Sequence, residues 1–313
     1  YHCLWINPAD SDHMLMGTDG GIDWSWDGGK TWDFVNTIAI GQFYEVGYDM
    51  EKPYRITGGL QDNGSWVGPS MALYRVHRVG ITNADWIEVG GSDGYFTLID
   101  PVDPNTVYAE TPDGNPSRRD LRTHESKPIR PPDPEGLPHN RFQWNTPIVI
   151  SSHDHKVLYY ASQYLYRSPD RGDSWERISP DLTTGIEQNS LPTMGRKPDA
   201  GTLSRNYGVW NWPCITSIGE SPLDPNLLWI GTDDGRLQVT RDRGKTWQDV
   251  ISRVPGVPKM VYVSRVVPSR HAEGTAYVSF DNHRLNDFEP YIFVTTDFGQ
   301  TFRPITSGIR RDK

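Results

Sequence analysis

The chain has 313 residues, of which 40 are Asp or Glu and 31 are Lys or Arg, so its formal net charge is −9. Nucleic-acid binding needs a concentrated basic surface, and this acidic balance argues against such a partner. The sequence holds no run of 18 apolar residues, so no membrane-spanning helix is expected. The 30 Gly and 25 Pro residues interrupt the chain too often for long helices, and they predict an all-β, turn-rich protein.

Six repeats of one pattern follow each other along the chain: strand, turn, strand, loop, strand, tight turn, strand. Four antiparallel strands in this order make one blade of a β-propeller. The phrase NPADSDHMLMGTDGG from Asn7, for example, recurs as SPLDPNLLWIGTDDG from Ser221. Residues 1–313 are therefore expected to form a single propeller domain or a fragment of one. The predicted blades are residues 2–37, 41–76, 92–129, 145–182, 212–252 and 262–308.

Four of the repeats contain a short turn of the form S/T-x-D-x-G-x-S/T-W/F, the Asp-box pattern. These turns are SWDGGKTW from Ser25, SPDRGDSW from Ser168, TRDRGKTW from Thr240 and TTDFGQTF from Thr295. The Asp carboxylate can accept backbone N–H bonds, and the Gly supplies the positive φ that the turn needs. Four Asp residues are therefore expected to hold turns and to take no part in catalysis: Asp27, Asp170, Asp242 and Asp297.

The boxes, together with the phrases GGLQDNGS, RFQWNTP and SPDRGDSWERISPDLT, resemble the bacterial Asp-box proteins labelled glycosyl hydrolases. Those proteins are similar to the ten-bladed sortilin-type propeller. The resemblance covers nearly the whole chain and implies a propeller that is secreted, periplasmic or on the cell surface. It carries activity only by analogy. Six blades can close a ring, but ends at blade boundaries favour part of a larger ring of seven to ten blades.

One face of the propeller is expected to carry any functional site. The Asp boxes share a face with the turns between first and second strands, and the longest, least repetitive loops lie on the opposite face. A ring of carboxylates is predicted there, at the channel mouth: Asp19, Asp62, Asp93, Asp113, Asp233, Asp234 and Asp281. Glycoside cleavage needs two carboxyl groups about 5 to 10 Å apart, and the best candidates are Asp62, Asp93 and Asp234. A purely structural role in hairpins is the alternative for each.

Aromatic and basic side chains of the same face are candidates for ligand binding. Trp-Asn recurs before the first strands of blades four and five, so the indoles are expected near the axis, where they either stack on sugar or peptide or plug the channel. Two insertions, residues 111–143 and 183–207, interrupt the repeats, and such loops are often functional. Arginines of the first insertion are expected to meet an anionic group. The candidates are Trp144, Trp210, Asn211, Arg118, Arg122, His283 and Arg284.

The sequence predicts neither a metal site nor a cofactor, because the nine His residues show no ligand spacing. Sialidases share Asp boxes, but the chain lacks an Arg-Ile-Pro motif and a clear nucleophilic Tyr and Glu pair. The favoured hypothesis is a secreted or periplasmic propeller that binds a glycan, peptide or partner protein on the face opposite the boxes. The alternative is a glycoside hydrolase that cleaves a polysaccharide with two carboxylates of that face. A third hypothesis is assembly with other protein chains that cover the ring edges.

Overall fold

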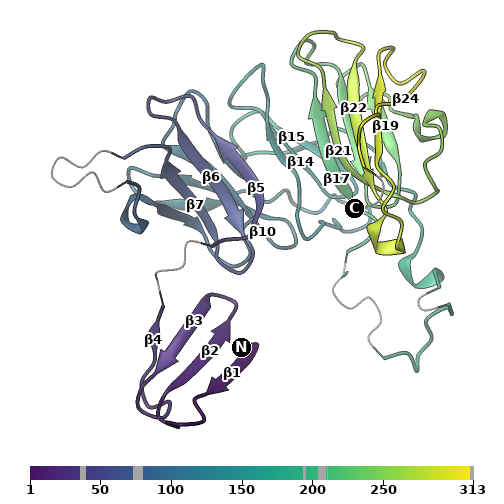
Figure 1. The fold of residues 1–313 in the computed structure, drawn as a ribbon. Helices are drawn as coiled ribbons and strands as arrows, with labels where there is room; N and C mark the ends of the chain where they lie inside the picture. Colours follow the sequence, from purple (N-terminus) through teal and green to yellow (C-terminus); the bar gives the residue numbers. More distant parts are fainter. Residues whose placement is uncertain (36–39, 73–79, 193–194, 204–208, 210, 311–313) are drawn as a thin grey trace.

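The computed structural model describes residues 1–35, 40–72, 80–192, 195–203, 209 and 211–310. Within these ranges the strands form six four-stranded antiparallel sheets, and each strand pairs with its neighbour in the chain (Figure 1). The structure confirms the predicted all-β fold of six propeller blades. None of the helices in the described residues is long and apolar enough to cross a membrane.

The bounds of the strands follow the repeats. Blade one contains β1 (Cys3–Ile6), β2 (Met14–Thr18), β3 (Gly21–Ser25) and β4 (Asp33–Phe34). Blade two contains β5 (Phe43–Tyr48), β6 (Arg55–Leu60), β7 (Ser65–Pro69) and β8 (Ile87–Gly90). Blade three contains β9 (Thr97–Ile99), β10 (Thr106–Thr111), β11 (Asn115–Asp120) and β12 (Ser126–Pro128).

The second half of the chain is built in the same way. Blade four contains β13 (Ile148–Ile150), β14 (Leu158–Ala161), β15 (Leu165–Ser168) and β16 (Glu176–Arg177). Blade five contains β17 (Ile215–Glu220), β18 (Leu228–Thr232), β19 (Leu237–Thr240) and β20 (Gln248–Asp249). Blade six contains β21 (Tyr262–Pro268), β22 (Ala276–Asp281), β23 (Tyr291–Thr295) and β24 (Arg303–Pro304). The short 3₁₀ helices are η1 (Asn83–Asp85), η2 (Gln188–Ser190), η3 (Ile251–Arg253) and η4 (His283–Leu285).

Two segments differ from the sequence-based expectation. Blade two extends beyond residue 76, because its fourth strand β8 follows η1 and pairs with β7 through Val67 and Ile87. The first part of the expected insertion at residues 111–143 forms regular strands. Its residues 115–128 form β11 and β12, and Arg118 pairs with Tyr108 of β10.

The Asp-box turns share one hydrogen-bond pattern, shown here for Asp242. One carboxylate oxygen accepts the Thr246 N–H at 2.9 Å and the Thr240 hydroxyl at 2.7 Å, and the other accepts the Thr246 hydroxyl at 2.6 Å. These bonds lower the pKa of Asp242 to about 2. Gly244 adopts a φ of +89°, and its N–H donates to the Thr240 hydroxyl. The same carboxylate bonds recur at Asp27, Asp170 and Asp297.

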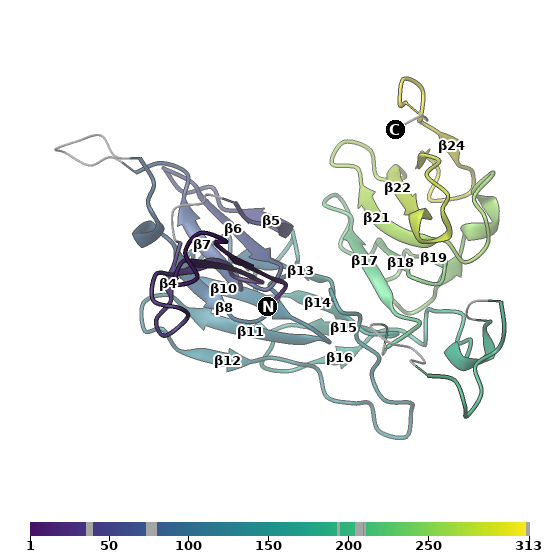
Figure 2. The ribbon, with the colours of Figure 1, turned by 60° about the horizontal axis from the view of Figure 1, so that its bottom comes forward.

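The hydrophobic cores lie between consecutive blades, from blade two to blade six. Trp229 of β18, for example, is fully buried with Val263 and Phe280 of blade six. Separate clusters join blades four and five, three and four, and two and three. Figure 2 shows blades three, four and five succeeding each other across the molecule. Blades two to six therefore form a continuous arc.

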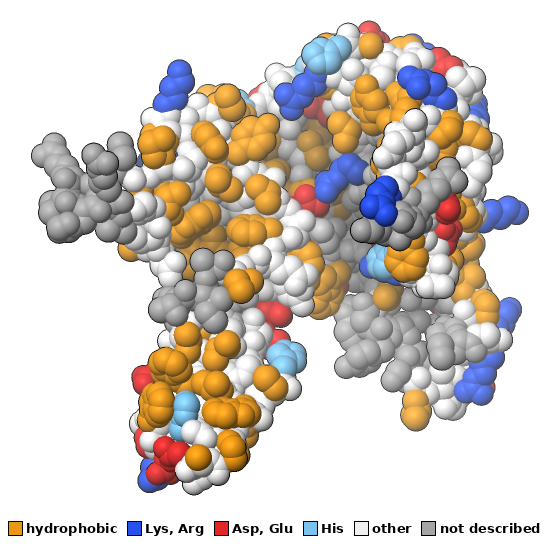
Figure 3. Space-filling model, viewed as in Figure 1, with side chains coloured by type: hydrophobic (Ala, Val, Ile, Leu, Met, Phe, Trp, Pro, Cys, Tyr) orange, Lys and Arg blue, Asp and Glu red, His pale blue; other side chains and the backbone are white. Residues whose placement is uncertain are grey.

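Blade one stands apart from this arc (Figure 1). The four buried clusters of the described residues contain no residue of blade one. All four residues of β1 are exposed. Figure 3 shows apolar side chains on the surface of blade one and over β5–β7. Its β2–β3 turn touches blade two, where the Asn63 side-chain amide donates to the Asp19 carbonyl at 3.3 Å. This turn places Asp19 beside the loops of the arc.

Candidate functional site

Three carboxylates from blades one, two and three meet at the ends of the blades opposite the Asp boxes. Asp19 lies in the β2–β3 turn, Asp62 in the β6–β7 turn, and Asp93 between β8 and β9. We call these three residues the carboxylate site. Asp62 and Asp93 are two of the three acid or base candidates expected from the sequence, and the structure brings them together.

The loops that carry Asp62 and Asp93 are held together by backbone contacts. The Asp62 N–H donates to the Asp93 carboxylate at 2.7 Å, and the Gly94 N–H donates to the Leu60 carbonyl at 2.9 Å. A Cβ on Gly59 would lie 2.0 Å from the carbonyl carbon of Gly94, so only glycine permits this approach. Asp62 has a φ of +60°, a left-handed conformation that Asp tolerates better than most residues. The glycines of GGLQDNG therefore set the geometry of the pair.

The Asp19 carboxylate is held by a histidine from the neighbouring strand. The His2 N–H donates to the Gly17 carbonyl at 2.9 Å, which continues the β1–β2 ladder by one residue. This pairing sets His2 diagonally opposite Asp19, and its Nε2 contacts the Asp19 carboxylate. Both side chains are more than half exposed. The contact therefore lies at a solvent-accessible surface.

The carboxylates of the site are shifted in opposite directions. Partial burial and the neighbouring charge of Asp93 raise the pKa of Asp62, and the Asp19 charge adds to this shift. The hydrogen bond from His2 lowers the pKa of Asp19. Two carboxyl groups whose environments separate their pKa values are the usual arrangement for an acid and a base. The pKa of Asp62 is therefore shifted above its usual value and that of Asp19 below it.

Two tyrosines form an aromatic surface next to the carboxylates. The rings of Tyr44 and Tyr95 lie 4.6 Å apart between centroids, and Tyr44 is 36% exposed while Tyr95 is buried. Burial and the Asp93 charge raise the pKa of Tyr44, so its hydroxyl stays a hydrogen-bond donor at neutral pH. An exposed ring beside a carboxylate pair is a surface on which a sugar can stack.

Asp234, the third catalytic candidate, lies in a different environment. It is 2% exposed, and both of its carboxylate oxygens accept hydrogen bonds, one from the Thr232 hydroxyl at 2.5 Å and one from the Thr184 N–H at 2.7 Å. Its carboxylate ties the β18–β19 turn to residue 184, so Asp234 lies apart from the carboxylate site, and its role as acid or base stays a prediction. Burial, with the adjacent Asp234 charge, raises the pKa of Asp233 well above its usual range.

The other candidates of the same face do not join the carboxylate site. His283 bonds to Asp281 at 2.7 Å, and the Arg284 guanidinium lies 5.5 Å from the centroid of the Tyr262 ring. Trp144 is 39% exposed before β13. Asn211 bonds to the Asp113 carboxyl, whose pKa is raised by burial. Trp210 lies outside the described residues.

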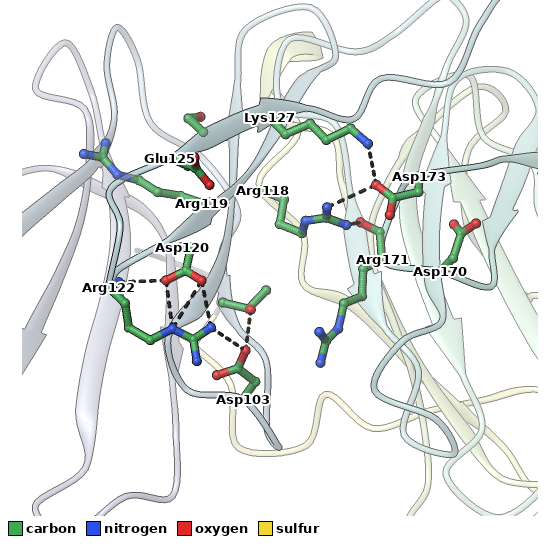
Figure 4. A pocket seen from close by; sticks show the side chains of 12 residues that line it. Asp103, Arg118, Arg119, Asp120, Arg122, Glu125, Lys127, Asp170, Arg171 and Asp173 are labelled. Atoms are coloured by element: carbon green, nitrogen blue, oxygen red, sulfur yellow. Dashed lines mark hydrogen bonds and ion pairs between the residues drawn. The ribbon is translucent and has the colours of Figure 1, made fainter.

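Arg118 and Arg122 lie at the Asp-box end of blade three, not on the face where they were expected. They line a charged cavity of about 640 Å³ between blades three and four (Figure 4). Arg122 pairs with Asp103 at 3.1 Å and with Asp120 at 2.7 Å, and Arg118 pairs with Asp173 at 3.1 Å. The cause is that residues 115–128 form strands and do not loop over the opposite face. Both guanidinium groups therefore pair with carboxylates at this end of the blade, and their role in ligand binding stays a prediction.

Sequence reasoning missed the histidine and tyrosines of the site. His2, Tyr44 and Tyr95 match no motif, and only the placement of their strands reveals them. The alternation FYEVGY from Phe43 was the available signal for Tyr44, because it marks a first strand that begins at the loop end. No cluster of three or more His, Cys, Asp or Glu side chains among the described residues has the geometry of a metal site.

The chain is similar to several glycan-acting proteins, although no protein-family model matches it. An oligoxyloglucan-reducing end-specific xyloglucanase of Emericella nidulans is 23% identical over 260 residues, covering 77% of this chain and 28% of the relative. A protein of Neosartorya fischeri named a probable xyloglucanase of the same type is 26% identical over 195 residues, 59% of this chain and 21% of the relative. A sialidase of Bacteroides fragilis is 22% identical over 306 residues, 91% of this chain and 48% of the relative.

Solved structures support the fold. An ancestral GH74 enzyme superposes with a TM-score of 0.54 at 13% identity, over 97% of this chain and 38% of that chain. The extracellular domain of a B. thetaiotaomicron protein superposes with a TM-score of 0.50 at 13% identity, over 96% of this chain and 32% of that chain. The chain spans less than half the length of these three curated relatives and of these two solved structures.

Proposed function

We propose that this chain carries the catalytic carboxylates of a glycoside hydrolase that acts on a polysaccharide. The observation that supports the proposal is the carboxylate site, where Asp62 and Asp19 have pKa values shifted in opposite directions. The xyloglucanase relatives agree with this activity. The site residues come from three blades, and their loops lie on the face opposite the Asp boxes.

In the proposed reaction Asp62 is the general acid and Asp19 the general base. Asp62 donates its proton to the glycosidic oxygen while the bond from that oxygen to the anomeric carbon breaks. Asp19 takes a proton from a water molecule, whose oxygen forms the new bond to the anomeric carbon. Asp93 keeps a negative charge beside Asp62 and so favours its protonated form. Each positioned acid or base typically contributes about 10²- to 10⁴-fold to the rate.

The charge of the site favours a glycan without carboxylate groups. Asp19, Asp62 and Asp93 give this surface a negative potential, and like charges repel an acidic sugar. The arginines Arg118 and Arg122 are engaged in ion pairs at the other end of blade three. We therefore favour a neutral polysaccharide of the xyloglucan class over a sialoside, although one relative is named a sialidase.

The proposal includes membership of the Asp-box proteins and a location outside the cytoplasm. The common hydrogen-bond pattern of the four turns supports the first part. An extracellular domain among the similar structures supports the second. A polysaccharide is a substrate that an exported enzyme would meet outside the cytoplasm.

A hydrolysis assay with matched variants tests the proposal. We expect release of reducing ends from xyloglucan oligosaccharides by the native chain, and a loss of about 10²- to 10⁴-fold in kcat/KM for Asp62→Asn and for Asp19→Asn. Asp33→Asn, an exposed position on β4 of the same blade, is the control and should retain activity. If Asp62→Asn and Asp19→Asn keep full activity, the assignment is wrong. Binding of the glycan with no turnover by the native chain would instead support the binding hypothesis.

A further inference from the structure

We infer that His2 is a positioning residue, which orients the Asp19 carboxylate and keeps it ionised as the base of the proposed reaction. The inference rests on the proposed function and extends it to a residue outside the carboxylates. It draws on the contact between the two side chains, on their exposure and on the charges around them.

The backbone fixes His2 next to Asp19. Cys3 pairs with Gly17 in the β1–β2 ladder, and the His2 N–H continues that ladder to the Gly17 carbonyl. A Cβ on Gly17 would lie 2.7 Å from the Cys3 sulfur, so a larger residue there would displace the Cys3 side chain. The β2–β3 turn then brings Asp19 back over the edge of β1, within contact of His2 Nε2. Asn63 of blade two holds the same turn through the Asp19 carbonyl.

The exposure of the pair argues against a purely structural purpose. The His2 side chain is 67% exposed and that of Asp19 is 53% exposed. Ion pairs with this much solvent contact contribute little to folding stability. A histidine that donates to a carboxylate does, however, fix the rotamer of the carboxylate and favour its charged form. This effect is useful at a base that must be ionised while Asp62 beside it is protonated.

Several charged groups face Asp19, and they act in different directions. The hydrogen bond and the charge of His2 lower the pKa of Asp19, while partial burial opposes them. The charge of Asp19 in turn raises the pKa of Asp62, which Asp93 raises further, and His2 opposes both. Removal of His2 therefore moves the two carboxyl groups in the same direction, because both lose a favourable positive neighbour.

Two measurements test the inference: carboxyl carbon NMR follows the titration of Asp19, with its signal assigned from Asp19→Asn, and a pH profile of kcat/KM follows the reaction. We expect His2→Ala to raise the pH at which Asp19 titrates and to move the acidic limb of the kcat/KM profile to higher pH with it. On that limb kcat/KM should fall about two- to five-fold, as for a partly solvated ion pair. His2→Gln keeps a hydrogen-bond donor without a charge, so an intermediate shift is expected. His271→Ala, an exposed histidine of blade six, is the control.

The outcomes separate this inference from the proposed function. If the titration of Asp19 does not change in His2→Ala, the inference is overturned even when hydrolysis is observed. A titration shift without movement of the acidic limb overturns the positioning role and leaves an ordinary ion pair. If the native chain hydrolyses no glycan, the proposed function fails, and the NMR titration still decides whether His2 controls the charge of Asp19.

Discussion

Arg265 on β21 and Glu45 on β5, which are 220 residues apart in the chain, form an ion pair with a nitrogen–oxygen distance of 2.6 Å. The pair joins the first strands of blades six and two, which are the two ends of the arc. The Arg265 guanidinium also lies 5.9 Å from the centroid of the Phe96 ring in blade three. The arc is therefore curved enough for its ends to meet at one point.

Breaking this pair should change the shape of the arc more than its stability. The Arg265 side chain is 47% exposed, so a double-mutant cycle of Arg265→Met and Glu45→Gln is expected to give a coupling energy below about 1 kcal/mol. Small-angle scattering should show a larger radius of gyration for Arg265→Met. Arg236→Met is the matched control, because Arg236 pairs with Asp249 inside blade five. Unchanged scattering in Arg265→Met would mean that other contacts hold the ends together.

Asp93 should control the alkaline limb of the activity profile. In the proposed reaction Asp62 must be protonated, so activity is lost as the pH rises through the pKa of Asp62. The Asp93 charge raises that pKa, and Asp93→Asn removes the charge. The alkaline limb is therefore expected to move to lower pH, while the acidic limb, which reports Asp19, stays in place.

A full pH profile of kcat/KM for Asp93→Asn and the native chain measures this shift. Asp113→Asn, which changes another carboxyl of the same face, is the control and should leave both limbs unchanged. An alkaline limb that stays at the same pH in Asp93→Asn would show that Asp62 is not the group that limits activity there.

The Asp-box turn of blade five should make folding stability depend on acid. The pKa of Asp242 is lowered to about 2 by bonds from Thr246 and Thr240, so its contribution is complete above the pKa of the unfolded chain and is lost as the pH falls towards 2. Asp242→Ala removes these bonds and should lower the free energy of unfolding by at most about 1 kcal/mol at neutral pH, because the turn is exposed to solvent. Thermal unfolding at pH 7 and pH 2.5 should show this difference shrinking in acid. Glu273→Gln, at an exposed position before β22, should show no such change.

The blades were predictable because their signals are local. An Asp box needs only seven or eight consecutive residues to satisfy its own hydrogen bonds, and its pattern therefore survives in the sequence. Topology also predicted that Asp62 and Asp93 share a face, since both follow strands that end on the same side. The direction in which a side chain points depends on residues far away in the sequence. Asp234, for example, turns inward because the N–H of Thr184, 50 residues away, donates to its carboxylate.

Strand β11 shows why the arginines were misplaced. Its sequence NPSRRD contains a proline and three charged residues, which is typical of a loop. Pairing with β10 and β12 on both sides outweighs this local preference. The separation of blade one from the arc is likewise a matter of packing between blades. The repeat pattern defines each blade but does not show which blades touch.

Glu110 provides a test of how the interior between blades three and four tolerates charge. It is 0% exposed, and neither carboxylate oxygen makes a hydrogen bond to another described residue within normal geometry. Burial raises the pKa of Glu110 well above its usual range. The buried carboxyl is therefore protonated in the folded chain at a pH where it is ionised in the unfolded chain.

The free energy of unfolding should consequently fall as the pH rises, and Glu110→Gln should remove this pH dependence. With a folded-state pKa above the unfolded one, the stability contribution is complete below the unfolded pKa and is lost as the pH rises through the folded value. Glutamine has the size of glutamate and stays neutral, so the free energy of unfolding of the variant is expected to exceed that of the native chain by roughly 1 to 3 kcal/mol at the alkaline end of the range. Urea unfolding between pH 5 and pH 9 measures the difference, with the exposed Glu125→Gln as control. Parallel stability curves for Glu110→Gln and the native chain would show that Glu110 is ionised in the fold and that a partner compensates its charge.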